Sequence, residues 1–185
     1  MAKSLNLFAF LSLNNKLPRM KALLLIISLL FLQTALAKGV YQTPESFLKS
    51  HFNDDVPSSK TIWLNKEKKQ VISNILQHTP RFIRVKYWQK GEKTAWILHE
   101  VGKEKPITVG IIIENSSIKK LKVLEFRESR GWEVKHEFFT HQFNELKLTP
   151  QQMLNGTVDG ISGATLSVRA LKKMARISLY LDQQR

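Results

Sequence analysis

Four apolar runs with short gaps between residues 83 and 126 constrain the fold of this 185-residue chain most strongly. In the first, Ile83, Val85 and Tyr87 alternate with polar neighbours, as in a strand with one buried face. Residues 95–99, 108–114 and 118–126 continue the series. The turn residues 115–117 separate the last two runs, so we expect Ile111 and Val123 to lie on paired antiparallel strands.

Helices are predicted on both sides of this strand region. Thr43 and Pro44 form a start signal for a short helix, and Asn65 precedes a second with apolar residues at helical spacing. A closing helix is predicted over 166–181, with one apolar face formed by Val168, Leu171, Met174, Ala175 and Leu181. The pattern predicts an α+β fold: a mainly antiparallel sheet with packed helices.

The first 37 residues have the layout of a secretory signal peptide. A basic region precedes the apolar run 22–32, and Ala35-Leu36-Ala37 forms a small-residue cleavage site. Met20 alone could start a complete signal. We therefore expect residues 38–185 to form a single exported domain, soluble in the periplasm or associated with the inner membrane, with a retained anchor as the alternative.

Charge and cysteine content narrow the possible functions. Residues 1–37 hold four of the 29 basic residues and none of the 15 acidic ones, so the net charge falls from +14 to +10 on their removal. This surface could attract polyanions or anionic lipid, but export makes nucleic acid an unexpected partner. The chain has no cysteine, which excludes disulfides, thiolate-bound clusters and haem attachment.

The stretch DGISGATLS, residues 159–167, lies just before the closing helix. The first N–H groups of a helix lack internal partners and favour an anion, and Gly160 and Gly163 would allow a phosphate close to the backbone. The hydroxyls of Ser162, Thr165 and Ser167 could contribute. Considered alone, the same pattern also fits an ordinary turn in which Thr165 caps the helix.

The whole run resembles the flavinylation motif D-G-x-(S/T)-G-A-T of FMN-binding domains. These domains also occur in subunits of the sodium-translocating NADH:quinone reductase and of the Rnf electron-transport complex. In that family, a flavin transferase joins FMN to the last Thr of the motif through a phosphoester. The resemblance implies covalent FMN at Thr165, with Asp159, Gly160, Ser162, Gly163, Ala164 and Ser167 as the surrounding site.

Similarity extends upstream over a motif core of residues 101–181. Residues 101–134 resemble the central strands and flavin-facing loop of the family, which implies site roles for Glu128 and Gly131. Arg130 and Trp132 depart from the usual loop sequence. Residues 139–143 resemble an aromatic and Gln-Phe element of the same family. The resemblance also suggests that Trp132 could stack on the flavin ring.

The remaining polar residues give no catalytic pattern. His78, His99, His136 and His141 lack metal-ligand spacing, and Glu128, Glu133 and Glu137 read as solvated loop carboxylates rather than an acid/base pair. Trp88, Trp96 and Trp132 are core candidates. Arg169, Lys172 and Lys173 could neutralise a phosphate or simply face solvent.

These observations predict an electron carrier rather than a self-sufficient enzyme. The cofactor would be covalent FMN, matured by a flavin transferase, and the partner a membrane-bound flavin or haem reductase, as the resemblance implies. Covalent attachment suits an exported protein because a dissociated cofactor would be lost by dilution. The alternatives are an FMN-dependent reductase of an extracytoplasmic acceptor and a basic polyanion-binding protein without flavin.

Overall fold

The computed structural model describes residues 39–185, so the predicted signal peptide lies outside the described residues. Five strands form one antiparallel meander in the order β1-β2-β3-β4-β5. They are β1 (Ser59–Trp63), β2 (Arg84–Lys90), β3 (Lys93–Val101), β4 (Pro106–Glu114) and β5 (Ser117–Phe126). The prediction of an α+β fold with an antiparallel sheet is confirmed.

The β4–β5 hairpin forms where the turn residues predicted it. Asn115 and Ser116 both have positive φ angles, as a two-residue type I′ turn requires. Ser117, which the sequence pattern assigned to the turn, instead pairs with Glu114 as the first residue of β5. Ile111 and Val123 do lie on paired strands, although their direct partners are Leu121 and Val109.

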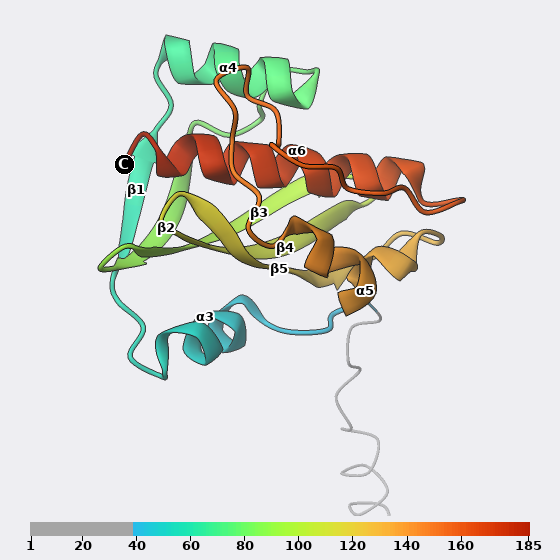
Figure 1. The fold of residues 1–185 in the computed structure, drawn as a ribbon, viewed down its shortest axis with the longest axis horizontal. Helices are drawn as coiled ribbons and strands as arrows, with labels where there is room; N and C mark the ends of the chain where they lie inside the picture. The colour runs from blue at the N-terminus through green and yellow to red at the C-terminus, as the bar shows by residue number, and fades with distance from the viewer. Residues whose placement is uncertain (1–38) are drawn as a thin grey trace, which may run out of the picture. The chain divides into compact units, whose positions relative to one another are not determined.

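Helices cover both faces of the sheet (Figure 1). One face is covered by α6 (Thr165–Asp182), against which α4 (Lys66–Leu76) packs. The other face carries α3 (Pro44–Phe52), whose Phe47, Leu48 and Phe52 bury against Ala95, Ile112 and Leu124. The predicted caps Thr43 and Asn65 accept hydrogen bonds from the first turns of α3 and α4.

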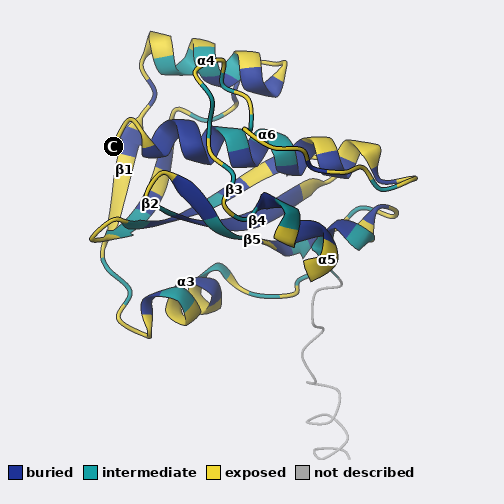
Figure 2. Ribbon diagram, viewed as in Figure 1, coloured by how far each residue is buried: buried dark blue, intermediate teal, exposed yellow. Residues whose placement is uncertain are grey.

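The larger core lies between α6 and the sheet, and the C-terminal half of α6 is mostly dark blue, that is buried, in Figure 2. The five predicted apolar residues of this helix are all buried. Trp96, predicted as core, is fully buried, whereas Ile83, predicted to share the inner face of β2, is exposed because β2 begins one residue later. Trp132 is also exposed rather than in the core.

Between β5 and α6 the chain makes three short turns of helix, which are η1 (Trp132–Lys135), α5 (Glu137–Thr140) and η2 (His141–Phe143). Phe139 and Phe143 anchor this segment in the core with rings 5.8 Å apart. The segment holds the chain near the start of α6, which positions the candidate site.

A buried polar network fixes the far end of α6 on the sheet. Thr94 donates to Asp182 at 2.6 Å and accepts from the indole N–H of Trp96 at 3.0 Å. Arg185 donates to the same carboxylate at 3.1 Å. Each of these buried groups therefore has a partner, as buried polar atoms require.

Replacing Thr94 by Val is expected to lower the free energy of unfolding by about 2 kcal/mol. Valine keeps the shape of Thr but leaves the Trp96 indole N–H without its acceptor and the Asp182 carboxylate with one donor fewer. Urea denaturation would measure the change. The matched control is Thr61→Val, at an exposed position of β1, where a comparable loss would show that β-strand hydroxyls in general explain the effect.

Candidate functional site

Thr165 is the first residue of α6, not its cap. The N-cap position is Ala164, whose methyl group cannot accept a hydrogen bond, and no side chain caps this helix. The first turn also contains no acidic residue. The interpretation of Thr165 as an ordinary N-cap is therefore wrong, and the start of an 18-residue helix is left with its positive end open to an added anion.

The hydroxyl groups predicted to surround the site differ in accessibility. Thr165 and Ser162 are exposed, whereas Ser167 is buried, and neither serine provides a side-chain cap for α6. The Thr165 hydroxyl makes no hydrogen bond with any residue in the described range. It is thus accessible from solvent.

Gly163 lies in the turn that delivers the chain to α6. Its φ of +80° is in the left-handed region that side chains other than glycine adopt only with strain. Gly160 has no such angle, and a methyl group added there would meet open space. The two glycines of the motif therefore differ, since the backbone demands only the second.

The loop after β5 packs directly on the first turn of α6. A Cβ on Gly131 would lie 2.8 Å from the Ser167 hydroxyl and 3.3 Å from the Ala164 Cα, and Gly131 also has a φ of +84°. Only glycine fits both the angle and this contact. Two segments that are far apart in the sequence, both named by the resemblance, thus meet at Gly131 and Ala164.

Glu128 fixes the other wall of the site. Its Oε1 accepts from the backbone N–H groups of Lys103, Glu104 and Lys105 in the β3–β4 turn, the last two at 2.8 and 3.0 Å. Burial opposes its ionisation, but these three donors outweigh that effect and lower the pKa of Glu128. The expectation of a merely solvated carboxylate is wrong, because this side chain joins two loops.

Replacing Glu128 by Gln is expected to lower the free energy of unfolding near neutral pH by about 1 kcal/mol, because an amide oxygen accepts more weakly than a carboxylate. A lowered folded-state pKa contributes stability above the unfolded pKa of about 4.3, and this is lost as pH falls through the folded value. The difference between the two proteins should therefore shrink on acidification. Denaturant titrations at neutral and acid pH would measure it, and a pH-independent difference would contradict the assigned role.

These elements enclose a pocket of about 500 Å³ at the start of α6. Its lining contains five predicted site residues together with two cations that the motif did not indicate. The lining residues are Lys103, Glu128, Ser129, Arg130, Gly163, Ala164, Thr165, Leu166 and Ser167. An exposed hydroxyl, an open helix start and two cationic side chains in one pocket suit a phosphate ester.

Asp159 and Gly160 lie outside this pocket because the chain turns at residues 162–163 before entering α6. They line a neighbouring pocket with Lys172 and Arg176. The Asp159 N–H donates to the side chain of Gln142 at 2.7 Å, so the Gln-Phe element holds the beginning of the motif. The Asp159 carboxylate itself is on an exposed residue, where another protein could contact it.

The three basic residues of α6 that were candidates for binding the phosphate do not line the Thr165 pocket. Lys173 lies 3.6 Å from the buried carboxylate of Glu100, which also contacts His78 at 3.1 Å. Lys172 lines the neighbouring pocket, and Arg169 is exposed. Lys103 and Arg130 are therefore the cations of the Thr165 pocket. The sequence showed Arg130 only as a departure from the family loop, and no sequence feature predicted that Lys103 would line this pocket.

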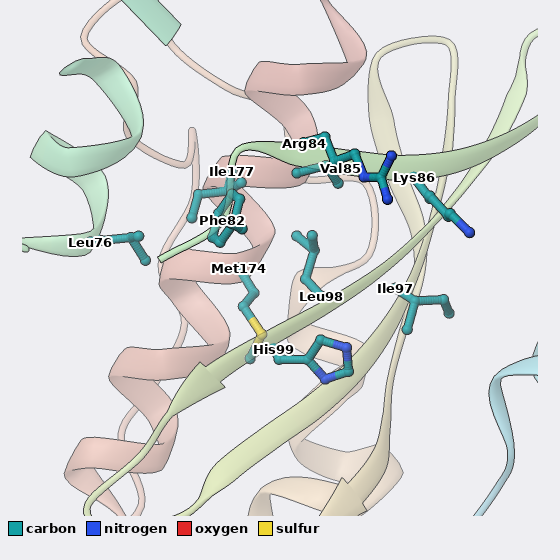
Figure 3. A pocket seen from close by; sticks show the side chains of 10 residues that line it. All are labelled: Leu76, Phe82, Arg84, Val85, Lys86, Ile97, Leu98, His99, Met174 and Ile177. Carbon is teal, nitrogen blue, oxygen red and sulfur yellow. The ribbon is translucent and has the colours of Figure 1, made fainter. Parts of the chain in front are cut away.

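A separate apolar crevice of about 190 Å³ lies between β2, β3 and α6 (Figure 3). Leu98 and Met174 point toward each other there, and Phe82 and Ile177 lie beside them. None of its lining residues belongs to the run 159–167 that holds Thr165. The candidate site is therefore the pocket at Thr165.

Within residues 39–185, no group of three or more His, Asp or Glu side chains could hold a metal ion. The same residues include no helix with the length and apolar character needed to cross a bilayer.

Comparison with known families agrees with the geometry of this site. Residues 102–179 match the FMN-binding domain, a range that includes the β3–β4 turn, the Gly131 loop and the start of α6. No curated protein matches the chain. Residues 102–179 are therefore similar to the FMN-binding domain, and flavin binding is the function that this similarity supports.

Proposed function

We propose that this protein is an exported electron carrier in which FMN is joined through a phosphoester to Thr165. The observation that carries the proposal is the position of Thr165: an exposed hydroxyl at the uncapped start of α6, inside a complete D-G-x-S-G-A-T motif. The family match supports FMN as the cofactor. Covalent attachment, electron transfer and export are the parts that the experiments below address.

The residues around Thr165 suit the phosphate end of FMN. An ester at the first residue of α6 would place its negative charge beside the free N–H groups of the first turn. Lys103 and Arg130 line the same pocket and would balance that charge. Gly163 and Gly131 keep bulky side chains away from this end of the helix.

FMN supplies the redox chemistry when bound, while the protein holds and orients it. The described residues include no set of side chains that could bind a metal ion and no cysteine. An ester bond at Thr165 would retain the cofactor in a compartment without a pool of free FMN. These properties support an electron carrier, and the resemblance implies a membrane-bound flavin or haem reductase as its partner.

Intact-mass analysis tests the covalent attachment. The full chain would be produced with and without a flavin transferase, and a visible absorption spectrum would be recorded after denaturation. We expect a mass increase equal to FMN less one water only with the transferase, together with a retained flavin spectrum. Protein that is unmodified and colourless in the presence of an active transferase would contradict the proposal.

Two other measurements test the remaining parts. N-terminal sequencing of protein from its native host should find a mature start near Lys38, with the protein outside the cytoplasm. A carrier should be reduced by isolated membranes and show no sustained turnover with soluble donors and acceptors. Sustained turnover with a soluble acceptor would favour the reductase alternative.

A further inference from the structure

A group of exposed side chains lies close to the Thr165 pocket, because Trp132 is separated only by Gly131 from Arg130 of the pocket lining. We call this group the aromatic cluster, and its members are Tyr41, Trp132, Lys135, His136 and Phe138. The Lys135 ammonium lies 4.3 Å from the centre of the Tyr41 ring and 5.1 Å from that of Trp132. His136 continues the chain of contacts, 5.3 Å from Trp132 and 6.1 Å from Phe138.

Three aromatic side chains of the cluster are exposed to solvent. Tyr41 is 42% exposed, Trp132 47% and Phe138 66%. Phe138 belongs to α5, whose exposed residues are yellow in Figure 2, while its neighbour Phe139 is fully buried. Contiguous exposed aromatic side chains commonly mark an interaction site.

The chemistry of the cluster suits a phospholipid surface. Tryptophan and tyrosine prefer the boundary between lipid and water, and lysine is attracted by anionic headgroups. Glu137 on α5 is paired with Lys120 at 2.6 Å, so its negative charge is balanced, and Glu133 on η1 is half-buried. The net charge of +10 that remains without residues 1–37 also favours an anionic membrane.

The course of the chain gives an independent reason. The described residues begin at Gly39, and Tyr41 is both part of the cluster and hydrogen bonded to Leu124 of β5. The apolar sequence 22–32 ends only nine residues before Tyr41, a distance that an extended chain covers in about 30 Å at most. In a chain that keeps this sequence as an anchor, the alternative to cleavage, Tyr41 would lie within reach of the same lipid surface.

We propose that the aromatic cluster docks on an anionic phospholipid surface, with Trp132 and Phe138 entering the headgroup region. Gly131, next to Trp132, contacts Ala164 at the start of α6. Docking would therefore hold the Thr165 pocket close to the membrane, where a membrane-bound partner could reach it. This consequence rests on the proposed function, whereas docking itself does not require flavin.

Site-directed spin labelling tests the docking, since the chain has no cysteine of its own. A nitroxide would be placed in the full chain by His136→Cys or Phe138→Cys, with Ile83→Cys as the control. Ile83 is an exposed apolar residue outside the aromatic cluster. The measurement compares collision of the nitroxide with oxygen, which concentrates in lipid, and with a nickel chelate, which stays in water.

With vesicles containing phosphatidylglycerol, we expect the ratio of oxygen to nickel collisions to rise severalfold at positions 136 and 138 and to stay unchanged at 83. Water-like ratios at all three positions would overturn the proposal and favour a protein partner for the cluster. Equal increases at all three would also overturn it, as non-specific adsorption. The intact mass of each sample reports flavinylation separately, so the two proposals can fail independently.

Discussion

Replacement of Thr165 by Val is expected to abolish covalent flavin attachment completely. Valine has nearly the same shape as Thr and keeps the branched Cβ at the first position of α6, so only the hydroxyl is lost. Because Thr165 is exposed and its hydroxyl makes no hydrogen bond within residues 39–185, the free energy of unfolding should change by less than about 0.5 kcal/mol. Intact mass after production with a flavin transferase measures the effect.

One control variant and the burial of Ser167 make this result specific to one hydroxyl. Ser162→Ala removes the other exposed hydroxyl within residues 159–167 and should leave the mass increase intact. Ser167 is buried against Gly131 and is poorly placed for modification in the folded protein. If Thr165→Val kept the full mass increase, attachment would lie elsewhere, and the proposed role of Thr165 would be wrong.

The same variant separates the two non-enzymatic interpretations. A basic polyanion-binding protein without flavin should be colourless with either residue at position 165. The structure has already removed one support for that alternative, since Ala164 and not Thr165 occupies the N-cap of α6. Full modification of the unsubstituted protein, together with none in the Thr165→Val variant, would exclude it.

Most of the fold could be predicted because its signals are local. Thr43 and Asn65 accept hydrogen bonds as helix caps, and the turn residues at 115 and 116 adopt the positive φ angles of a tight hairpin. Periodicity also identified the buried face of α6. Each of these features depends on a few neighbouring residues, which a sequence pattern contains in full.

The candidate site could be predicted only in part, because its walls come from distant segments. Motif resemblance indicated Thr165 and Gly131, but nothing in the sequence showed that Glu128 uses its carboxylate to bind the β3–β4 turn. That hydrogen bonding brings Lys103 to the pocket. Such contacts depend on the tertiary arrangement of three loops, so no local pattern in the sequence predicts them.

The exposed position of Trp132 shows the same limit. An aromatic residue between apolar segments suggests a core position, yet Val134 and Phe139 fill the core here. Trp132 does not line the Thr165 pocket, and its ring contacts Lys135 and His136 instead. Stacking of Trp132 on a flavin ring remains a prediction.

Three Gly→Ala variants are expected to separate backbone strain from loop packing at the site. Gly131→Ala should lower the free energy of unfolding by about 2–4 kcal/mol, because it combines a positive φ with collision against Ser167 and Ala164. Gly163→Ala has the positive φ but no collision, so about 1–2 kcal/mol is expected. Gly160→Ala has neither and should change stability little.

Flavinylation of the same variants then tests whether the Gly131 contact matters for the site. Urea denaturation measures the stability of the three proteins, and intact mass gives the modified fraction at a temperature where all are folded. We expect Gly131→Ala to reduce the modified fraction most, because moving the loop displaces Arg130 and disturbs the first turn of α6. If Gly131→Ala were as stable and as fully modified as Gly160→Ala, the close packing of this loop on Ala164 would not describe the protein in solution.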